Sequence, residues 1–134
     1  MNTVIFACGH NAGRSQMAAA FFNDLADLSK ASAVSAGTRP ADRVHPEVVD
    51  AMKEVGIDLA DAKPRQLNVE LARYARLLVT MGCGEECPVV PLLERVDWPI
   101  DDPKGQPPAR VREIRDEVRG RVERLVHERG WNRR

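Results

Sequence analysis

The segment TVIFACGHNAGRS, residues 3–15, decides the fold of this chain. Its first five residues, Thr3–Ala7, form a short apolar run that is typical of a buried parallel strand. Small and turn-forming residues follow, up to Gly13. Apolar residues then recur at spacings of three and four, which indicates an amphipathic helix with a stripe made of Met17, Ala20, Phe21, Leu25 and Leu28. The segment therefore predicts a strand, a tight loop and a helix in direct succession.

The rest of the chain continues this alternation of strands and helices. Further strands are predicted at residues 33–37, 77–81 and 96–100. Further helices are predicted after Pro46, around residues 71–75, and over the apolar stripe that follows the two prolines 107 and 108. Such alternation predicts an α/β fold in three layers, with a parallel sheet and helices on both faces. No repeat or long linker divides the sequence, so we expect one domain over residues 1–134.

Composition excludes several classes of function. The 134 residues carry 20 basic and 20 acidic side chains, so the formal net charge of zero lacks the electrostatic footprint of a nucleic-acid binder. No run reaches the roughly 18 apolar residues that a membrane span needs, and the start of the chain does not resemble a signal peptide. Three cysteines indicate a reducing compartment that keeps thiols for chemistry. We expect a cytoplasmic monomer with neither a nucleic-acid nor a membrane partner.

The C-terminal helix is rich in arginine. Residues 107–134 hold nine Arg and five acids, a formal charge of +4. An arginine-rich helix could bind RNA or an acidic partner. Acidic residues are interleaved with the arginines, however, and this pattern favours a solvated face with pairs four residues apart, built on Glu113, Asp116, Glu117, Glu123 and Glu128.

The loop after the first strand has the properties of an anion site. Backbone N–H groups at a helix N-terminus lack intrahelical acceptors, and the helix dipole adds positive potential, so a tetrahedral oxyanion can bind there. The same field favours a thiolate at Cys8. A lone cysteine at the end of a strand is often only a small buried hydrophobe, but its place between strand and helix, two glycines and a following serine favour the anion loop. The expected oxyanion-binding residues are Gly9, His10, Asn11, Ala12, Gly13, Arg14 and Ser15.

Individual side chains of this loop suit separate tasks. Arg14 lies six residues after Cys8 and can donate to two oxygens of the anion, a geometry that lysine does not match. The Ser15 hydroxyl can donate to the thiolate, and the Asn11 amide can brace the loop. His10 either shapes the loop and contacts the anion or simply faces solvent.

The string CGHNAGRSQ, residues 8–16, followed by Met17, resembles the signature of arsenate reductases built on the low-molecular-weight protein tyrosine phosphatase fold. The resemblance continues at residues 34–37, 81–83 and 98–103 and covers nearly the whole chain. It implies a four-stranded parallel sheet flanked by helices, with the anion loop at the carboxyl end of the first strand. It also implies an oxidoreductase that reduces arsenate to arsenite in arsenical resistance, with phosphate and sulfate as competing anions.

The resemblance assigns roles to residues outside the loop. Asp102, before Pro103, matches the family's general acid, which protonates the leaving oxygen. Asp101 is a rival for this role, and a plain Asp-Asp-Pro turn is the other interpretation. Cys83 matches a second thiol that attacks Cys8 and supplies the electrons for reduction.

Cys87 would then attack Cys83 and carry the disulfide outward to thioredoxin, so the implied catalytic residues are Cys8, Arg14, Ser15, Cys83, Cys87 and Asp102. Cys83 and Cys87 are closer in sequence than in thioredoxin-linked members, so glutathione with glutaredoxin, or mycothiol with mycoredoxin, stays open as the electron route. No tightly bound cofactor is expected beyond this external thiol reductant.

No metal site is predicted. Some members of the family bind potassium behind the loop through a Glu on the first helix, but the matching position here is Ala19. Cys83 and Cys87, which are separated by three residues, do not form a zinc signature with the scattered histidines.

Two other functions remain as alternatives. The first is a low-molecular-weight phosphatase that uses Cys8 and Asp102 on phosphotyrosine or a small phosphoester. Such enzymes usually have aromatic residues around the cleft, including a Tyr after the Asp-Pro pair, where this chain has Lys104 and its only tyrosine is Tyr74. The second is a redox or oxyanion sensor that uses Cys8 and Cys83 as a switch.

Overall fold

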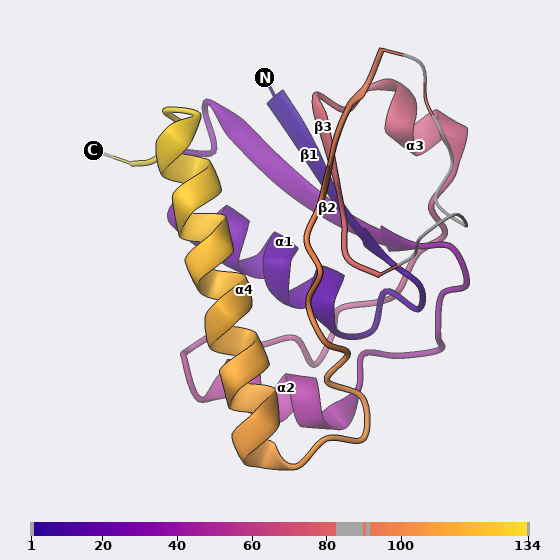
Figure 1. The fold of residues 1–134 in the computed structure, drawn as a ribbon, viewed down its shortest axis with the longest axis vertical. Helices are drawn as coiled ribbons and strands as arrows, with labels where there is room; N and C mark the ends of the chain where they lie inside the picture. The colour runs from indigo at the N-terminus through magenta and orange to yellow at the C-terminus, as the bar shows by residue number, and fades with distance from the viewer. Residues whose placement is uncertain (1, 83–89, 91, 134) are drawn as a thin grey trace.

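A parallel sheet of four strands forms the centre of the molecule. The computed structural model describes residues 2–82, 90 and 92–133. The strands are β1 (Asn2–Cys8), β2 (Ala31–Gly37), β3 (Leu77–Thr80) and β4 (Glu94–Asp97), in the spatial order β2-β1-β3-β4. Every neighbouring pair is parallel. The carboxyl ends of all four strands therefore lie at one edge of the sheet, of which Figure 1 labels β1, β2 and β3.

Helices cover both faces of the sheet, as the alternation of elements predicted. They are α1 (Arg14–Leu25), α2 (Pro46–Lys53), α3 (Val69–Arg73) and α4 (Pro108–Glu128). Successive strand residues point to opposite faces. One face packs against α1, α2 and α4 in a large core that includes Val4, Phe6, Leu77, Val79, Phe22, Met52 and Ile114, and the other packs against α3 in a small one that includes Ile5, Ala7, Leu78 and Ala72. The predicted fold class is confirmed.

The structure corrects the bounds of several predicted elements, among them the fourth strand and the first helix. The fourth strand was expected at residues 96–100 but lies at Glu94–Asp97. The Trp98 N–H still donates to Thr80 O at 2.8 Å, but Pro99 follows, and its ring fixes φ at about −65°, away from the φ of a parallel strand. The stripe of the first helix was extended to Leu28, which is 47% exposed beyond the end of α1. Asp27 ends that region in a turn by accepting the backbone N–H of Ser29.

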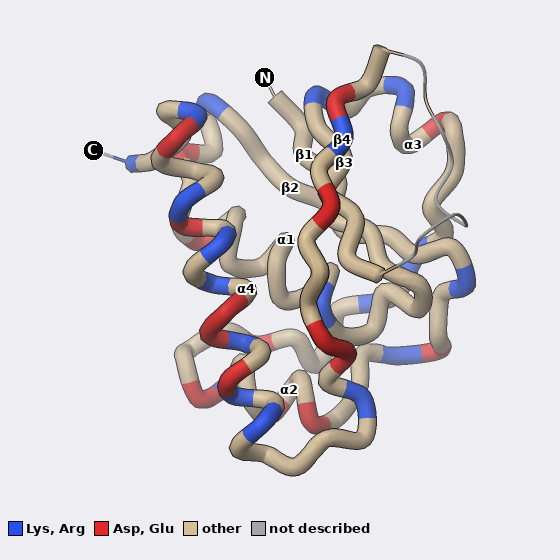
Figure 2. The backbone as a smooth tube through the Cα atoms, viewed as in Figure 1, with Lys and Arg blue, Asp and Glu red and all other residues tan. Residues whose placement is uncertain are grey.

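Acidic residues are interspersed among the arginines along α4 (Figure 2). Pairs within the helix join Arg119 to Glu123 at 3.0 Å and Arg121 to Glu117 at 3.4 Å. Other α4 arginines pair with acids elsewhere in the fold, as Arg112 does with Glu54. This arrangement is the one expected of a solvated, internally paired face. In the described part of the chain, no helix has both the length and the apolar character to cross a membrane.

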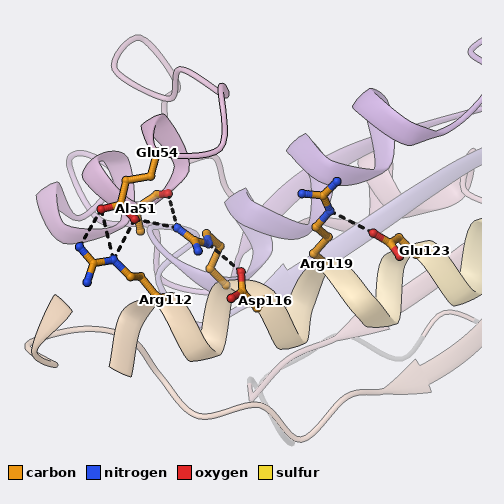
Figure 3. Close-up of polar contacts among 7 residues, drawn as sticks. Ala51, Glu54, Arg112, Asp116, Arg119 and Glu123 are labelled. Atoms are coloured by element: carbon orange, nitrogen blue, oxygen red, sulfur yellow. Dashed lines mark hydrogen bonds and ion pairs between the residues drawn. The ribbon is translucent and has the colours of Figure 1, made fainter. Parts of the chain in front are cut away.

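Glu54, just after α2, joins that helix to α4 (Figure 3). Its carboxylate accepts hydrogen bonds from Arg112 Nε at 2.9 and 3.2 Å and from Arg112 Nη2 at 2.8 Å. It also accepts one from Arg115 Nη1 at 2.9 Å. Arg115, only 8% exposed, also donates to Ala51 O at 2.9 Å. The hydrogen bonds from the Arg112 and Arg115 guanidinium groups lower the pKa of Glu54 to about 2.

This pKa predicts how acid affects the α2–α4 contact. A carboxyl whose pKa is depressed in the folded state adds stability above its unfolded pKa, near 4.5 for Glu, and loses that contribution as pH falls toward 2. Glu54→Gln should therefore melt a few degrees below the wild type at pH 7, and the difference should shrink between pH 5 and pH 3. Thermal unfolding across this range is the measurement. Glu70→Gln, on the exposed side of α3, is the control and should show no such trend.

Candidate active site

The loop between β1 and α1 places Cys8 at the sheet's carboxyl edge. Cys8 is the last residue of β1 and is 3% exposed, and α1 begins at Arg14. Gly13 precedes α1 without a side-chain cap, and the first intrahelical bond runs from Met17 N to Gly13 O at 3.0 Å. The preceding N–H groups of the helix therefore have no acceptor within it, as an anion-binding terminus requires.

Close contact with the end of β2 shapes this loop. A Cβ at Gly37 would lie 2.6 Å from Gly9 O and 2.8 Å from Asn11 N, so only glycine fits there. Asn11 has a φ of 51°, in the left-handed region that asparagine tolerates better than most residues. Its side-chain oxygen accepts the Arg65 N–H at 2.9 Å, and this bond fixes the unusual conformation from outside the loop.

A chain of buried polar groups leads to the thiol. Asn11 Nδ2 donates to Ser15 Oγ at 2.8 Å, and Ser15 Oγ lies 2.9 Å from Cys8 Sγ. Because Nδ2 carries only donors, Ser15 Oγ must accept that bond, and its own hydrogen is left for the sulfur. The Asn11 and Ser15 side chains are fully buried. The network thus directs the Ser15 hydroxyl hydrogen toward Cys8 Sγ.

The contact between Ser15 Oγ and Cys8 Sγ leads to a prediction for the reactivity of Cys8. Ser15→Ala removes a charge-assisted hydrogen bond worth about 1.5–3 kcal/mol, so alkylation of Cys8 by iodoacetamide at pH 7 should slow by about tenfold or more. The rate of alkylation, followed by mass spectrometry, is the measurement. Ser32→Ala is the matched control, because Ser32 lies near the start of β2, at the other end of the strand from the residue that pairs with Cys8. Equal rates in the two variants would mean that Ser15 does not support the thiolate.

Arg14 lies between the anion loop and the segment that follows β4. Its Nη1 donates to Ile100 O at 2.8 Å, and its Nη2 lies 3.7 Å from Asp102 Oδ2. Gly82, at φ +94°, packs against the same guanidinium, where a Cβ would lie 2.5 Å from Nη1. Together these contacts hold the guanidinium at a pocket of about 180 Å³ that is lined by Cys8, Gly9, His10, Ala12, Gly13, Arg14, Arg39, His45, Gly82 and Asp102.

The structure separates the two adjacent aspartates. Asp102 lines the pocket, and its Oδ1 accepts the Lys104 N–H at 3.0 Å. Asp101 instead pairs with Arg110 of α4 at 2.5 Å and is absent from the pocket lining. Of the two aspartates, only Asp102 lines the pocket, where a general acid would have to lie to reach a bound group.

Arg39 and His45 also line the pocket, although the sequence analysis did not select them. Arg39 follows the carboxyl end of β2, and His45 precedes the proline that starts α2. In the sequence, these positions next to the ends of predicted elements were the only indication that the two residues could reach the site. Burial lowers the pKa of His45, although Glu47 and Asp102 act in the opposite direction. His10 is exposed at the rim of the pocket.

Cys83 and Cys87, the other two predicted thiols, lie outside the described residues, and their roles remain predictions. Gly82, the residue before Cys83 in the chain, lines the pocket.

Side chains behind the loop are joined by hydrogen bonds. Position 19 is an alanine and offers no side-chain oxygen. Gln16 Nε2 donates to Asn11 O at 3.1 Å and to Asn11 Oδ1 at 3.2 Å, so these oxygens already have donors. Among the residues that the structure describes, no three His, Cys, Asp or Glu side chains are grouped closely enough to hold a metal ion.

Comparison with known proteins places the chain among relatives of this architecture. Over 129 residues it is 38% identical to "Arsenate reductase 1" of Bacillus cereus, covering 92% of this chain and 93% of that protein. It is 34% identical over 129 residues to "Glutaredoxin arsenate reductase" of Synechocystis, covering 94% and 97%. The solved thioredoxin-dependent arsenate reductase of Corynebacterium glutamicum superposes with a TM-score of 0.81 at 36% identity, over 96% of this chain and 61% of that one. The low molecular weight phosphotyrosine protein phosphatase family matches residues 3–132, and the chain belongs to that family.

Proposed function

We propose that this protein reduces arsenate to arsenite with Cys8 as the nucleophile. The observation that carries the proposal is the convergence of the Cys8 thiol, the Arg14 guanidinium and the Asp102 carboxyl on one small pocket at a helix N-terminus. The names of the relatives support arsenate as the substrate. Phosphate and sulfate have the same tetrahedral shape and should compete for the loop.

The first step would form a covalent adduct. The loop N–H groups and Arg14 hold arsenate, and the Cys8 thiolate attacks the arsenic. Asp102 protonates the departing oxygen, which leaves as water, so that a sulfur–arsenic(V) bond replaces an arsenic–oxygen bond. Arg14 lies 3.7 Å from Asp102 and can bind the anion and face the acid at the same time.

The second step would be the reduction itself. The Cys83 thiolate attacks Cys8 Sγ, a disulfide forms, and the electron pair of the sulfur–arsenic bond passes to arsenic, which leaves as arsenite. The two thiols thereby supply the two electrons. Cys87 then attacks Cys83, frees Cys8 and leaves a Cys83–Cys87 disulfide for an external reductant. The cycle needs a reducing compartment, in agreement with a cytoplasmic location.

Thioredoxin is the reductant we propose first, with a glutaredoxin or mycoredoxin system as the alternative. One solved relative is named as thioredoxin-dependent and a sequence relative as a glutaredoxin enzyme, so both routes have a precedent among the relatives. The assay is NADPH oxidation that depends on arsenate, measured with thioredoxin and its reductase, with glutathione and glutaredoxin, and with mycothiol and mycoredoxin. Oxidation that needs thioredoxin and disappears in Cys87→Ser supports the three-cysteine relay. Oxidation only with a low-molecular-weight thiol removes Cys87 from the mechanism.

Phosphomonoester hydrolysis is the second candidate, since the family is named for it and the pocket supplies the same nucleophile and acid. No phenyl, phenol or indole ring is among the described residues that line the pocket, so a phosphotyrosine ring has little to stack on. Brisk hydrolysis of p-nitrophenyl phosphate, without arsenate-dependent NADPH oxidation in any of the three systems, would make the protein a phosphatase.

A further inference from the structure

Glu47 connects α2 to the turn that carries Asp102. Its Oε2 accepts the Gly105 N–H at 2.9 Å, across 58 residues of sequence. Figure 1 shows the segment that leads into α4 passing beside α2, where this bond forms. The hydrogen bond from Gly105 is the main reason that the pKa of Glu47 is lowered, so the carboxylate is the form that holds the turn.

Asp102 belongs to the same tight turn as Gly105. Asp102 Oδ1 accepts the Lys104 N–H at 3.0 Å, and the Gln106 N–H donates to Pro103 O at 3.1 Å. Gly105 has a φ of +72°, which suits glycine. The Asp102 side chain is 47% exposed, and its polar contacts are the Lys104 N–H within the turn and the Arg14 guanidinium 3.7 Å away. The anchor at Gly105 therefore limits how far the carboxyl can move.

The N-terminal end of α2 also contacts the anion loop. The residue that precedes α2, His45, donates its N–H to Ala12 O at 2.9 Å. Pro103 also lies close to the loop, because a Cβ at Gly13 would be 3.0 Å from its Cγ. Hydrogen bonds therefore join α2 both to the turn that carries Asp102, through Glu47, and to the anion loop, through His45.

We infer that Glu47 is a positioning residue that holds Asp102 in line with the leaving oxygen of the bound oxyanion. The inference rests on the proposed function, in which Asp102 is the general acid. Glu47 does not line the pocket, so it acts through the turn and not on the substrate. Loss of the anchor should lower the rate of the chemical step, since small errors in the orientation of a catalytic group reduce rates strongly. Binding of the oxyanion by the loop should be unaffected.

The test compares two substitutions of the same residue. Glu47→Ala removes the acceptor and should lower kcat for arsenate about tenfold, with KM within about twofold of the wild type. Glu47→Gln keeps an acceptor oxygen for Gly105 and should restore most of the rate. Asp50→Ala, an exposed acid of the same helix, is the matched control and should retain wild-type kinetics. Thermal melts confirm that each variant is folded.

A double-mutant cycle with Asp102→Asn separates a positioning role from a general structural one. If Glu47 acts through Asp102, Glu47→Ala should cause no further loss once the acid is absent. A wild-type kcat in Glu47→Ala, or the same tenfold loss in both backgrounds, would overturn the inference. If the wild type itself reduces no arsenate, the proposed function fails, and the same cycle on phenyl phosphate hydrolysis then decides the role of Glu47, because that leaving oxygen needs the same proton.

Discussion

Cys8→Ser should abolish arsenate reduction, with a loss on the order of 10⁴-fold or more, as expected when the nucleophile of a cooperating set is removed. A serine hydroxyl stays protonated near neutral pH and cannot supply the electron pair that the reduction requires. Cys8 is buried at the end of β1, and an oxygen in place of the sulfur fits the same space. The fold and the anion loop should therefore survive the change.

Two measurements on the Cys8→Ser protein separate chemistry from binding. Steady-state NADPH oxidation should fall to background, while sulfate or arsenate should still raise the melting temperature, because the loop that binds the anion is intact. Cys83→Ser is the companion variant, in which mass spectrometry after exposure to arsenate should find no disulfide that involves Cys8. Residual turnover in Cys8→Ser would contradict the assignment of this residue as the nucleophile.

Arg14→Lys should lower kcat/KM for arsenate by about 10²-fold, the range seen when one donor to a developing oxyanion is lost. The guanidinium donates to Ile100 O with one nitrogen and presents the other beside Asp102, so it has a fixed orientation at the pocket. A lysine ammonium keeps the charge but is a single point donor on a flexible stem, and it cannot bind two oxygens in a plane.

The measurements are kcat/KM for arsenate and the dissociation constant for sulfate. In Arg14→Lys the first should fall and the second should rise, since the same side chain binds the ground state and the transition state. Arg43→Lys, an exposed arginine that does not line the pocket, is the control. Unchanged kinetics in Arg14→Lys would contradict its place in the anion site.

Local sequence was enough to predict the part of the candidate site around Cys8. Cys8, Arg14 and Ser15 lie within eight residues of one another, and a strand, a tight turn and a helix N-terminus follow from the residues between them. Local hydrogen bonding and hydrophobic periodicity decide such a unit, so its shape could be predicted without the rest of the chain. The parallel order of strands and helices followed from the same patterns.

Only the tertiary structure decided which distant groups complete the pocket. Asp101 and Asp102 are indistinguishable in sequence, and the structure separates them because Arg110 of α4 pairs with the first while the second faces Arg14. Arg39 and His45 reach the pocket because parallel crossovers bring the ends of separate strands to one edge of the sheet. The contact of Glu47 with Gly105 spans 58 residues. Such contacts depend on how whole elements pack, and no short stretch of sequence contains that information.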